Sequence, residues 1–153
     1  MFTKVMVTLD GSPLSEAVLP YAVRIAAGTG ASIELTSVVG VDALEIGREH
    51  QAYVDQLATQ AEVSVKAYLN RVAAGLRVQG LTVEEQVLLG KPAEAIASHA
   101  EKSGASVIAM STHGHSGLGR WMFGSVTDQV LHLTKTPMLI IRSAGNTPKD
   151  PEL

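Results

Sequence analysis

The chain has 153 residues, 46% of them apolar, and a formal net charge of −3, which suits a single domain with one hydrophobic core. Because there is no cysteine, disulfides, thiolate catalysis and cysteine-zinc sites are excluded. Aromatic residues make up only 4% and no basic run occurs, so nucleic acid is not an expected partner.

The N-terminal part of the chain predicts a strand followed by a helix. An apolar run over residues 5–9 predicts the strand. The run stops at Asp10-Gly11-Ser12-Pro13, whose serine can cap a helix and whose proline suits the first helical position. We expect this helix to reach Gly28, with a kink at Pro20, which lacks a backbone N–H.

The middle of the chain predicts strand, helix and strand. Residues 31–39 alternate in the manner of a strand, and residues 40–47 read as an irregular excursion. From Val54 to Val72 the apolar residues recur at spacings of three and four, which predicts a long helix that ends near Gly75. A third strand is expected over residues 81–88.

The last part of the chain repeats this alternation. Gly90-Lys91-Pro92 is typical of a helix start, and Gly104 is expected to end that helix. Residues 105–110 form a continuous apolar run, as in a strand buried on both faces. A final helix is expected to begin at Ser125, and residues 137–142 predict a fifth strand.

Strands and helices alternate throughout, which predicts an α/β fold with an open five-stranded parallel sheet and helices on both faces. Such sheets bind ligands beyond the carboxyl ends of the strands, where the strand order reverses. Asp10 and residues 111–125 both follow predicted strand ends. We assign residues 1–142 to the domain. Residues 143–153 have two prolines and mixed charge, and we expect them to be a disordered tail.

Targeting signals are not apparent in the sequence. The apolar N-terminus is too short for a signal sequence, because it runs directly into Asp10-Gly11-Ser12. No segment approaches the roughly 20 apolar residues of a membrane span. We therefore expect a soluble, cytoplasmic protein that has no membrane partner.

The segment after the fourth predicted strand is rich in glycine. Glycine lets backbone N–H groups approach a ligand, and with the free donors of a following helix they form a concavity for anions. Two common phosphate motifs are absent: Gly90-Lys91 is followed by proline where a P-loop needs Ser or Thr, and Gly117-Leu-Gly119 lacks the third glycine of the dinucleotide fingerprint. The glycines of this segment are Gly114, Gly117, Gly119 and Gly124.

The spacing in this segment is specific. Ser111-x2-Gly114-x9-Gly124-Ser125 resembles the nucleotide-binding signature of the universal stress protein family, Gly-x2-Gly-x9-Gly-Ser/Thr. The resemblance extends over residues 1–142, with one departure: Ser111 stands where the family has its first glycine. It implies a Rossmann-like fold of the adenine nucleotide alpha hydrolase type, with strand order 3-2-1-4-5.

The resemblance also implies a role for individual residues. Asp10, with Thr8 and Leu9 beside it, would face the adenine and ribose, and the backbone near Val38 would read the edge of the base. Met110 would flank the sugar. Because a carboxylate repels bare phosphate, Asp10 and the glycine-rich segment must address opposite ends of one ligand. The phosphate end would be held at Ser111, Gly114, His115, Gly117, Gly124, Ser125, Val126 and Thr127.

The function implied by the resemblance is an ATP-binding regulatory module of the stress response, with Mg²⁺ or Mn²⁺ accompanying the nucleotide and an unidentified downstream protein partner. A slow ATPase is one alternative, but the sequence shows no committed base or arginine finger. His115 could serve, although nothing positions it, and we assign no catalytic residue. A family member that dimerises without nucleotide is the other alternative.

Simpler interpretations stay open for several motifs. Asp10-Gly11-Ser12-Pro13 could be only a turn between strand and helix. His113 and His115 suggest a metal, but no third ligand lies at a recognisable spacing, so no metal site is assigned. The apolar residues 138–141 would leave unpaired backbone groups if they formed a sheet edge. Here the resemblance implies a homodimer through strand 137–142.

Overall fold

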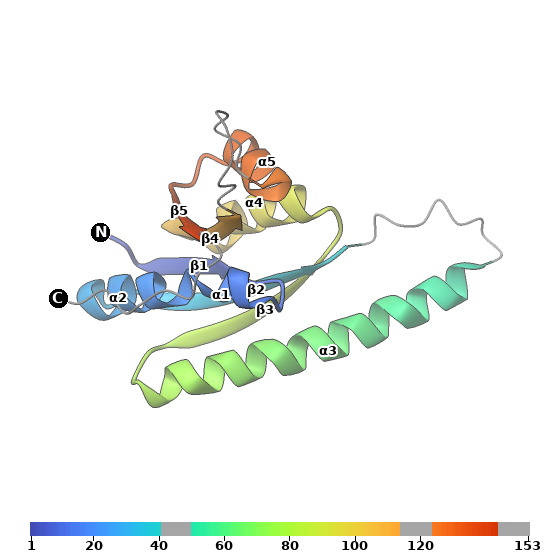
Figure 1. The fold of residues 1–153 in the computed structure, drawn as a ribbon, viewed down its shortest axis with the longest axis horizontal. Coiled ribbons are helices and arrows are strands. Elements are labelled where there is room, and N and C mark those ends of the chain that lie inside the picture. The colour runs from blue at the N-terminus through green and yellow to red at the C-terminus, as the bar shows by residue number, and fades with distance from the viewer. Residues whose placement is uncertain (41–49, 114–123, 144–153) are drawn as a thin grey trace.

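A computed structural model describes residues 1–40, 50–113 and 124–143 of the chain. Five parallel strands form one sheet in the order β3-β2-β1-β4-β5, which confirms the predicted α/β fold class and strand order (Figure 1). The strands are β1 (Lys4–Thr8), β2 (Ser32–Val39), β3 (Val83–Leu89), β4 (Val107–His113) and β5 (Met138–Ser143).

Helices cover both faces of this sheet (Figure 1). One face carries the first three helices and the other carries the last two, as expected for right-handed crossovers on either side of a parallel sheet. The helices are α1 (Pro13–Glu16), α2 (Leu19–Thr29), α3 (Gln51–Val78), α4 (Pro92–Ser103) and α5 (Ser125–Leu133).

The single kinked helix that we expected after β1 is instead two helices. α1 ends at Glu16, and α2 begins at Leu19 after a short turn. Pro20 is the second residue of α2, where its missing N–H removes no helical hydrogen bond, so the proline starts a helix rather than bending one. α2 also continues past Gly28 to Thr29, and Gly30 caps it in the left-handed conformation with φ of 74°.

The predicted end of the long helix was also wrong. α3 continues through Gly75 to Val78, and the turn that follows uses Gly80 with φ of 82°. Gly75 has open space around it and no left-handed backbone, so it does not act as a stop. In Figure 1 the N-terminal half of α3 extends beyond the sheet, and its apolar residues Tyr53 and Val63 are 61% and 64% exposed.

Side chains alternate between the two faces of the strands, so each face packs a separate core. The face under α2 and α3 packs a mainly aliphatic core, with Val7, Leu35 and Leu69 at its centre. The face under α4 and α5 packs a smaller group that includes Met6 and Ile108. Towards the carboxyl ends of the strands this second group gives way to a cavity, which Ile96 and Met110 of the group help to line.

The described residues contain no helix long and apolar enough to cross a membrane. Ser143, which we had assigned to the tail, is the last residue of β5. The irregular segment expected over residues 40–47 lies outside the described residues from position 41 onward. The rest of the predicted tail, residues 144–153, also lies outside them.

Candidate functional site

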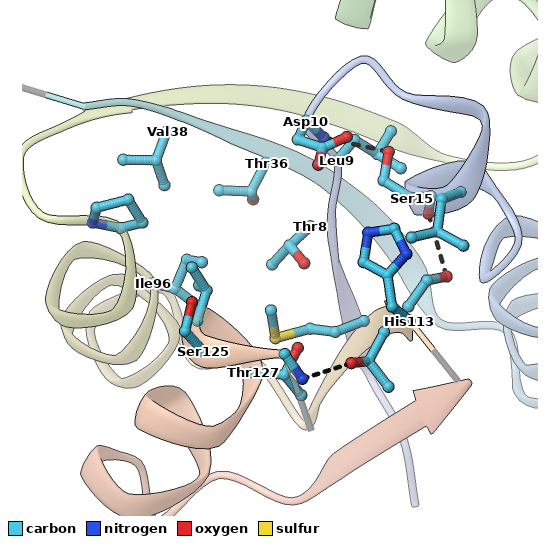
Figure 2. Close-up of a pocket in the computed structure, with 17 residues that line it drawn as sticks. Thr8, Leu9, Asp10, Ser15, Thr36, Val38, Ile96, His113, Ser125 and Thr127 are labelled. Atoms are coloured by element: carbon cyan, nitrogen blue, oxygen red, sulfur yellow. Dashed lines mark hydrogen bonds between the residues drawn. The ribbon is translucent and has the colours of Figure 1, made fainter. Parts of the chain in front are cut away.

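A cavity of about 360 Å³ opens at the carboxyl ends of β1, β2 and β4 (Figure 2). β1 pairs with β2 on one side and with β4 on the other, so the strand order reverses at this point and the crossovers leave a crevice. The cavity is lined by Thr8, Leu9, Asp10, Leu14, Ser15, Thr36, Val38, Pro92, Ile96, Met110, Ser111, Thr112, His113, Gly124, Ser125, Val126 and Thr127.

Ten of the thirteen predicted site residues lie together around this cavity, although they come from four separate stretches of sequence. They are Thr8, Leu9, Asp10, Val38, Met110, Ser111, Gly124, Ser125, Val126 and Thr127. The other three, Gly114, His115 and Gly117, lie outside the described residues.

Asp10 lies on the loop between β1 and α1, where hydrogen bonds fix its position. The Ser12 backbone N–H donates to Asp10 Oδ1 at 2.8 Å, and the Asp10 backbone N–H donates to Ser15 Oγ at 3.2 Å. Partial burial by itself would raise the pKa of Asp10, but the hydrogen bonds from Ser12 and Ser15 outweigh it and hold the pKa below its usual value. The exposed side chain therefore presents an ionised acceptor to the cavity at neutral pH.

The turn that holds Asp10 is also the start of α1. Ser12 Oγ accepts from the Ser15 backbone N–H at 3.1 Å, which confirms the predicted cap. Ser15 Oγ in turn donates to the Ser12 carbonyl at 2.8 Å. The motif is thus a strand-to-helix turn, and the same turn places its carboxylate at the cavity.

Gly124 and the beginning of α5 form the opposite side of the cavity. The Gly124 backbone N–H donates to Thr112 Oγ1 at 2.7 Å, which ties α5 to the end of β4. A Cβ at position 124 would lie 3.2 Å from that oxygen, so the close approach favours glycine. No side-chain hydrogen bond caps α5 in the described structure. Ser125, Val126 and Thr127, the first residues of α5, line the cavity. The first N–H groups of a helix have no partner within the helix, and such a terminus suits an anion.

Ser111, the departure from the family signature, lies within β4 opposite Ile141 of β5. Its backbone is extended, so the position makes no demand for the left-handed conformations that favour glycine. The side chain points to the α1 side of the sheet, where Ser111 Oγ donates to the Ser15 carbonyl at 3.3 Å. Serine at this position links the end of β4 to the turn that holds Asp10.

Between these two sides the cavity has an apolar wall and a hydroxyl-bearing floor. Val38 of β2 and Ile96 of α4 lie on the same side of the cavity (Figure 2), and Pro92 of α4 also lines it. The floor carries Thr8 and Thr36, which are directly opposite each other in the register of β1 and β2. A flat apolar ring would fit such a wall, while the floor can exchange hydrogen bonds with the ring's edge.

The sequence interpretation missed or left unassigned seven lining residues: Leu14, Ser15, Thr36, Pro92, Ile96, Thr112 and His113. Thr36 had one available signal, because a polar residue in the middle of a strand buried on both faces needs a reason. Pro92 had another, because it opens a helix directly after a strand end, where parallel sheets bind ligands. No three His, Asp or Glu side chains among the described residues form a cluster that could hold an ion. His115 lies outside the described residues, so the metal interpretation of His113 and His115 stays untested.

The family model and the curated relatives that match this chain point to the same protein family. The model of the Universal stress protein family matches residues 1–142. Universal stress protein YxiE of Bacillus subtilis is 29% identical over 153 residues, which cover 93% of this chain and 100% of that protein.

Solved structures resemble the chain over nearly its whole length. MJ0577 of Methanocaldococcus jannaschii has a TM-score of 0.82 at 22% identity, with 95% of this chain and 99% of that one covered. A universal stress protein in complex with cAMP has a TM-score of 0.68 at 23% identity, covering 92% and 97% of the two chains. The protein from Archaeoglobus fulgidus in complex with dAMP has a TM-score of 0.64 at 20% identity, covering 92% and 98%. These structures share the fold of this chain.

Proposed function

Because this chain belongs to the universal stress protein family, we propose that its cavity binds an adenine nucleotide and that the protein is a nucleotide-dependent regulatory module of the stress response. The proposed ligand is ATP, with Mg²⁺ or Mn²⁺ carried by its phosphates. Occupancy of the cavity would change the surface around it and so control a downstream protein partner.

The observation that carries the proposal is the separation of polar groups around one cavity. An ionised carboxylate, Asp10, lies on one side, and the start of α5, which no described side chain caps, lies on the other. A carboxylate suits the hydroxyls of a ribose, and free backbone N–H groups suit phosphate. The apolar wall of Val38, Pro92 and Ile96 suits the base. Two proteins with the same fold were solved with cAMP and with dAMP, which share an adenine base.

Regulation by binding is a better match to the described residues than hydrolysis. Hydrolysis of ATP needs a group that orients or deprotonates the attacking water. The titratable side chains among the described lining residues are Asp10 and His113. The lowered pKa of Asp10 makes it a weak proton acceptor at neutral pH. His113 is exposed at the end of β4 and has no hydrogen-bonded partner among the described residues that would orient its ring.

Thermal unfolding with and without ATP tests the proposal. A ligand at 100 times its dissociation constant raises the free energy of unfolding by about 2.7 kcal/mol. Gly124→Val should abolish that increase, because the added side chain meets Thr112 Oγ1 beside the start of α5. Gly28→Val is the matched control, because Gly28 lies in α2 with open space around it and should leave the ATP effect intact.

Two results would contradict the proposal. One is a wild-type protein that shows no thermal stabilisation by ATP and carries no nucleotide in mass spectrometry of the purified material. The other is a Gly124→Val protein that folds and keeps the full ATP effect, since that would place any nucleotide site elsewhere.

We further propose a homodimer through residues 137–142. β5 is an edge strand of the described sheet, so no described strand pairs with its outer side. Residues 138–141 are all apolar and all partly exposed, which leaves an edge that is prone to pair. Ile140 belongs to neither core, so its side chain is available to a partner copy.

Light scattering at micromolar concentration tests the dimer. Ile140→Lys should give a monomer, because an edge lysine opposes strand pairing. Val63→Lys is the control: it places the same charge on an exposed apolar position of α3 and should leave the dimer intact. A wild-type monomer would refute this interface.

A further inference from the structure

Thr36 is an unusual residue on the floor of the cavity. It is completely buried in the middle of β2, yet its Oγ1 has no hydrogen-bond partner. Within the described residues, the other buried side-chain oxygen without a hydrogen-bond partner is Ser103 Oγ, at the end of α4. Ser103 does not line the cavity. Figure 2 shows the hydroxyl of Thr36 turned toward the hollow, between Thr8 and Ile96.

Two polar neighbours of Thr36 in β2 are already engaged elsewhere, and Thr8, directly opposite in β1, makes no hydrogen bond to it. Glu34, two residues earlier on the same face of β2, already accepts from Lys4 and pairs with His99. Ser37 points to the other face and donates to the Leu9 carbonyl. Buried hydroxyls are nearly always hydrogen-bonded, so an unpaired one at the floor of a cavity indicates a partner that arrives with a ligand.

The position of Thr36 identifies which part of a nucleotide would meet it. Val38 and Ile96 beside it form the apolar wall, whereas Asp10 and the start of α5 lie at other sides of the cavity. The flat base is the part of a nucleotide that an apolar wall accepts. Adenine carries ring nitrogens on its edges that accept hydrogen bonds and that would be desolvated in this position.

We propose that Thr36 Oγ1 donates a hydrogen bond to a ring nitrogen of the bound adenine, and that Thr36 is thereby a specificity-determining residue for the base. This inference rests on the proposed nucleotide binding. A site that offers a buried donor rejects a ligand that lacks the matching acceptor, because both groups would otherwise stay unpaired.

The test uses three variants and calorimetric titration with ATP. Thr36→Val keeps the shape of the side chain and removes the hydroxyl, so the affinity for ATP should fall about ten-fold. Thr36→Ser keeps the hydroxyl and should retain most of the affinity. Ser103→Ala removes the other unpaired hydroxyl, far along α4 from the cavity, and should leave the affinity unchanged.

The melting temperature of the ligand-free protein provides a second test, in which Thr36→Val should stabilise the protein although it weakens ATP binding. Thr36→Val should raise the melting temperature without ligand by about 2 °C, because it removes a buried polar group that has no partner. A lower melting temperature would mean that the hydroxyl already has a partner, for example a buried water, and would overturn the inference.

Ligand analogues identify the atom that Thr36 contacts. Replacing N1, N3 or N7 of ATP by carbon removes one ring acceptor at a time. One of the three deaza analogues should bind the wild-type protein about ten-fold more weakly than ATP, while Thr36→Val should bind that analogue and ATP equally. If each analogue loses the same factor in both proteins, the hydrogen bond does not exist and the inference fails.

The two proposals fail in distinguishable ways. A wild-type protein that binds no adenine nucleotide refutes the proposed function and this inference with it. A wild-type protein that binds ATP while Thr36→Val binds it equally well refutes the role of Thr36 and leaves nucleotide binding standing.

Discussion

Leu35 and Thr36 are neighbours in β2, and both are completely buried, but they belong to different parts of the molecule. Leu35 points into the aliphatic core under α2 and α3. Thr36 points the other way, to the floor of the cavity. The comparison teaches that burial alone does not separate a core residue from a site residue in a parallel sheet. The face of the strand on which a side chain lies determines whether the residue belongs to the core or to the site.

The two faces of the sheet differ in the same way over their whole area. The face under α2 and α3 is closed and mainly aliphatic, and its one buried polar residue in β2, Ser37, is hydrogen-bonded to the Leu9 carbonyl, so its residues contribute to stability. The face under α4 and α5 holds buried polar groups as well as apolar ones, including Glu34 and Thr127. It combines a small core with the candidate site at the carboxyl ends of the strands, and Ile96 and Met110 belong to both. Substitutions on the two faces should therefore separate stability from nucleotide binding.

The largest expected effect belongs to the aliphatic face. Leu35→Ala should lower the free energy of unfolding by about 3 kcal/mol, because it removes buried methyl groups and leaves a cavity in a closed core. Urea unfolding measures this loss. At a temperature where the variant is folded, its affinity for ATP should equal that of the wild type. Weaker binding by the folded variant would break the proposed division between the faces.

A smaller effect is expected from Glu34, a buried polar residue of the other face that lies outside the cavity. Glu34 is 5% exposed and pairs with His99 Nε2 at 2.8 Å and Lys4 Nζ at 3.5 Å. Glu34→Ala should cost about 2 kcal/mol, less than a fully buried pair, because His99 and Lys4 keep some contact with water.

Chemical unfolding of a matched pair of variants checks this value. Glu84 also pairs with Lys4, but its side chain is 62% exposed, so Glu84→Ala should change the free energy of unfolding by less than about 0.5 kcal/mol. Neither variant should alter ATP binding. Equal losses for Glu34→Ala and Glu84→Ala would show that burial of this ion pair contributes nothing.

The smallest effect is expected at Ser111. Ser111→Gly restores the glycine of the family signature and removes the hydrogen bond to the Ser15 carbonyl. The free energy of unfolding should fall by about 1 kcal/mol, from the lost hydrogen bond and the extra freedom of glycine in the unfolded chain. Because the side chain points to α1 rather than across the cavity, ATP affinity should change by less than about two-fold. A ten-fold gain in affinity would show instead that the serine obstructs the ligand.

Much of the fold followed from local patterns in the sequence. Alternating apolar runs and helical spacings are local features, and they placed all five strands within a few residues. Pro20 and Gly75 were misjudged for a different reason. A proline can kink a helix or begin one, and a glycine can end a helix or lie inside it. Tertiary packing decides between these outcomes, and packing is not visible in a short window of sequence.

The candidate site was only partly predictable. Of the residues that carry the family signature, Ser111, Gly124 and Ser125 lie with Asp10 around one cavity, and the family resemblance had indicated them. Gly114 lies outside the described residues. Contacts between residues that are far apart in the sequence left no recognisable pattern in it. The hydrogen bond from Ser111 to Ser15 joins residues 96 positions apart, and α4 contributes Ile96 to the wall only because of the crossover. The missing partner of Thr36 is a property of the folded molecule and has no counterpart in the sequence.

A crystal structure of the protein grown with a non-hydrolysable ATP analogue tests the central claim most directly. The account predicts the base against Val38 and Ile96, the ribose hydroxyls within hydrogen-bond distance of Asp10, and the phosphates at the backbone N–H groups of residues 125–127. A nucleotide bound outside this cavity, or bound inside it with its phosphates against the carboxylate of Asp10, would contradict the account.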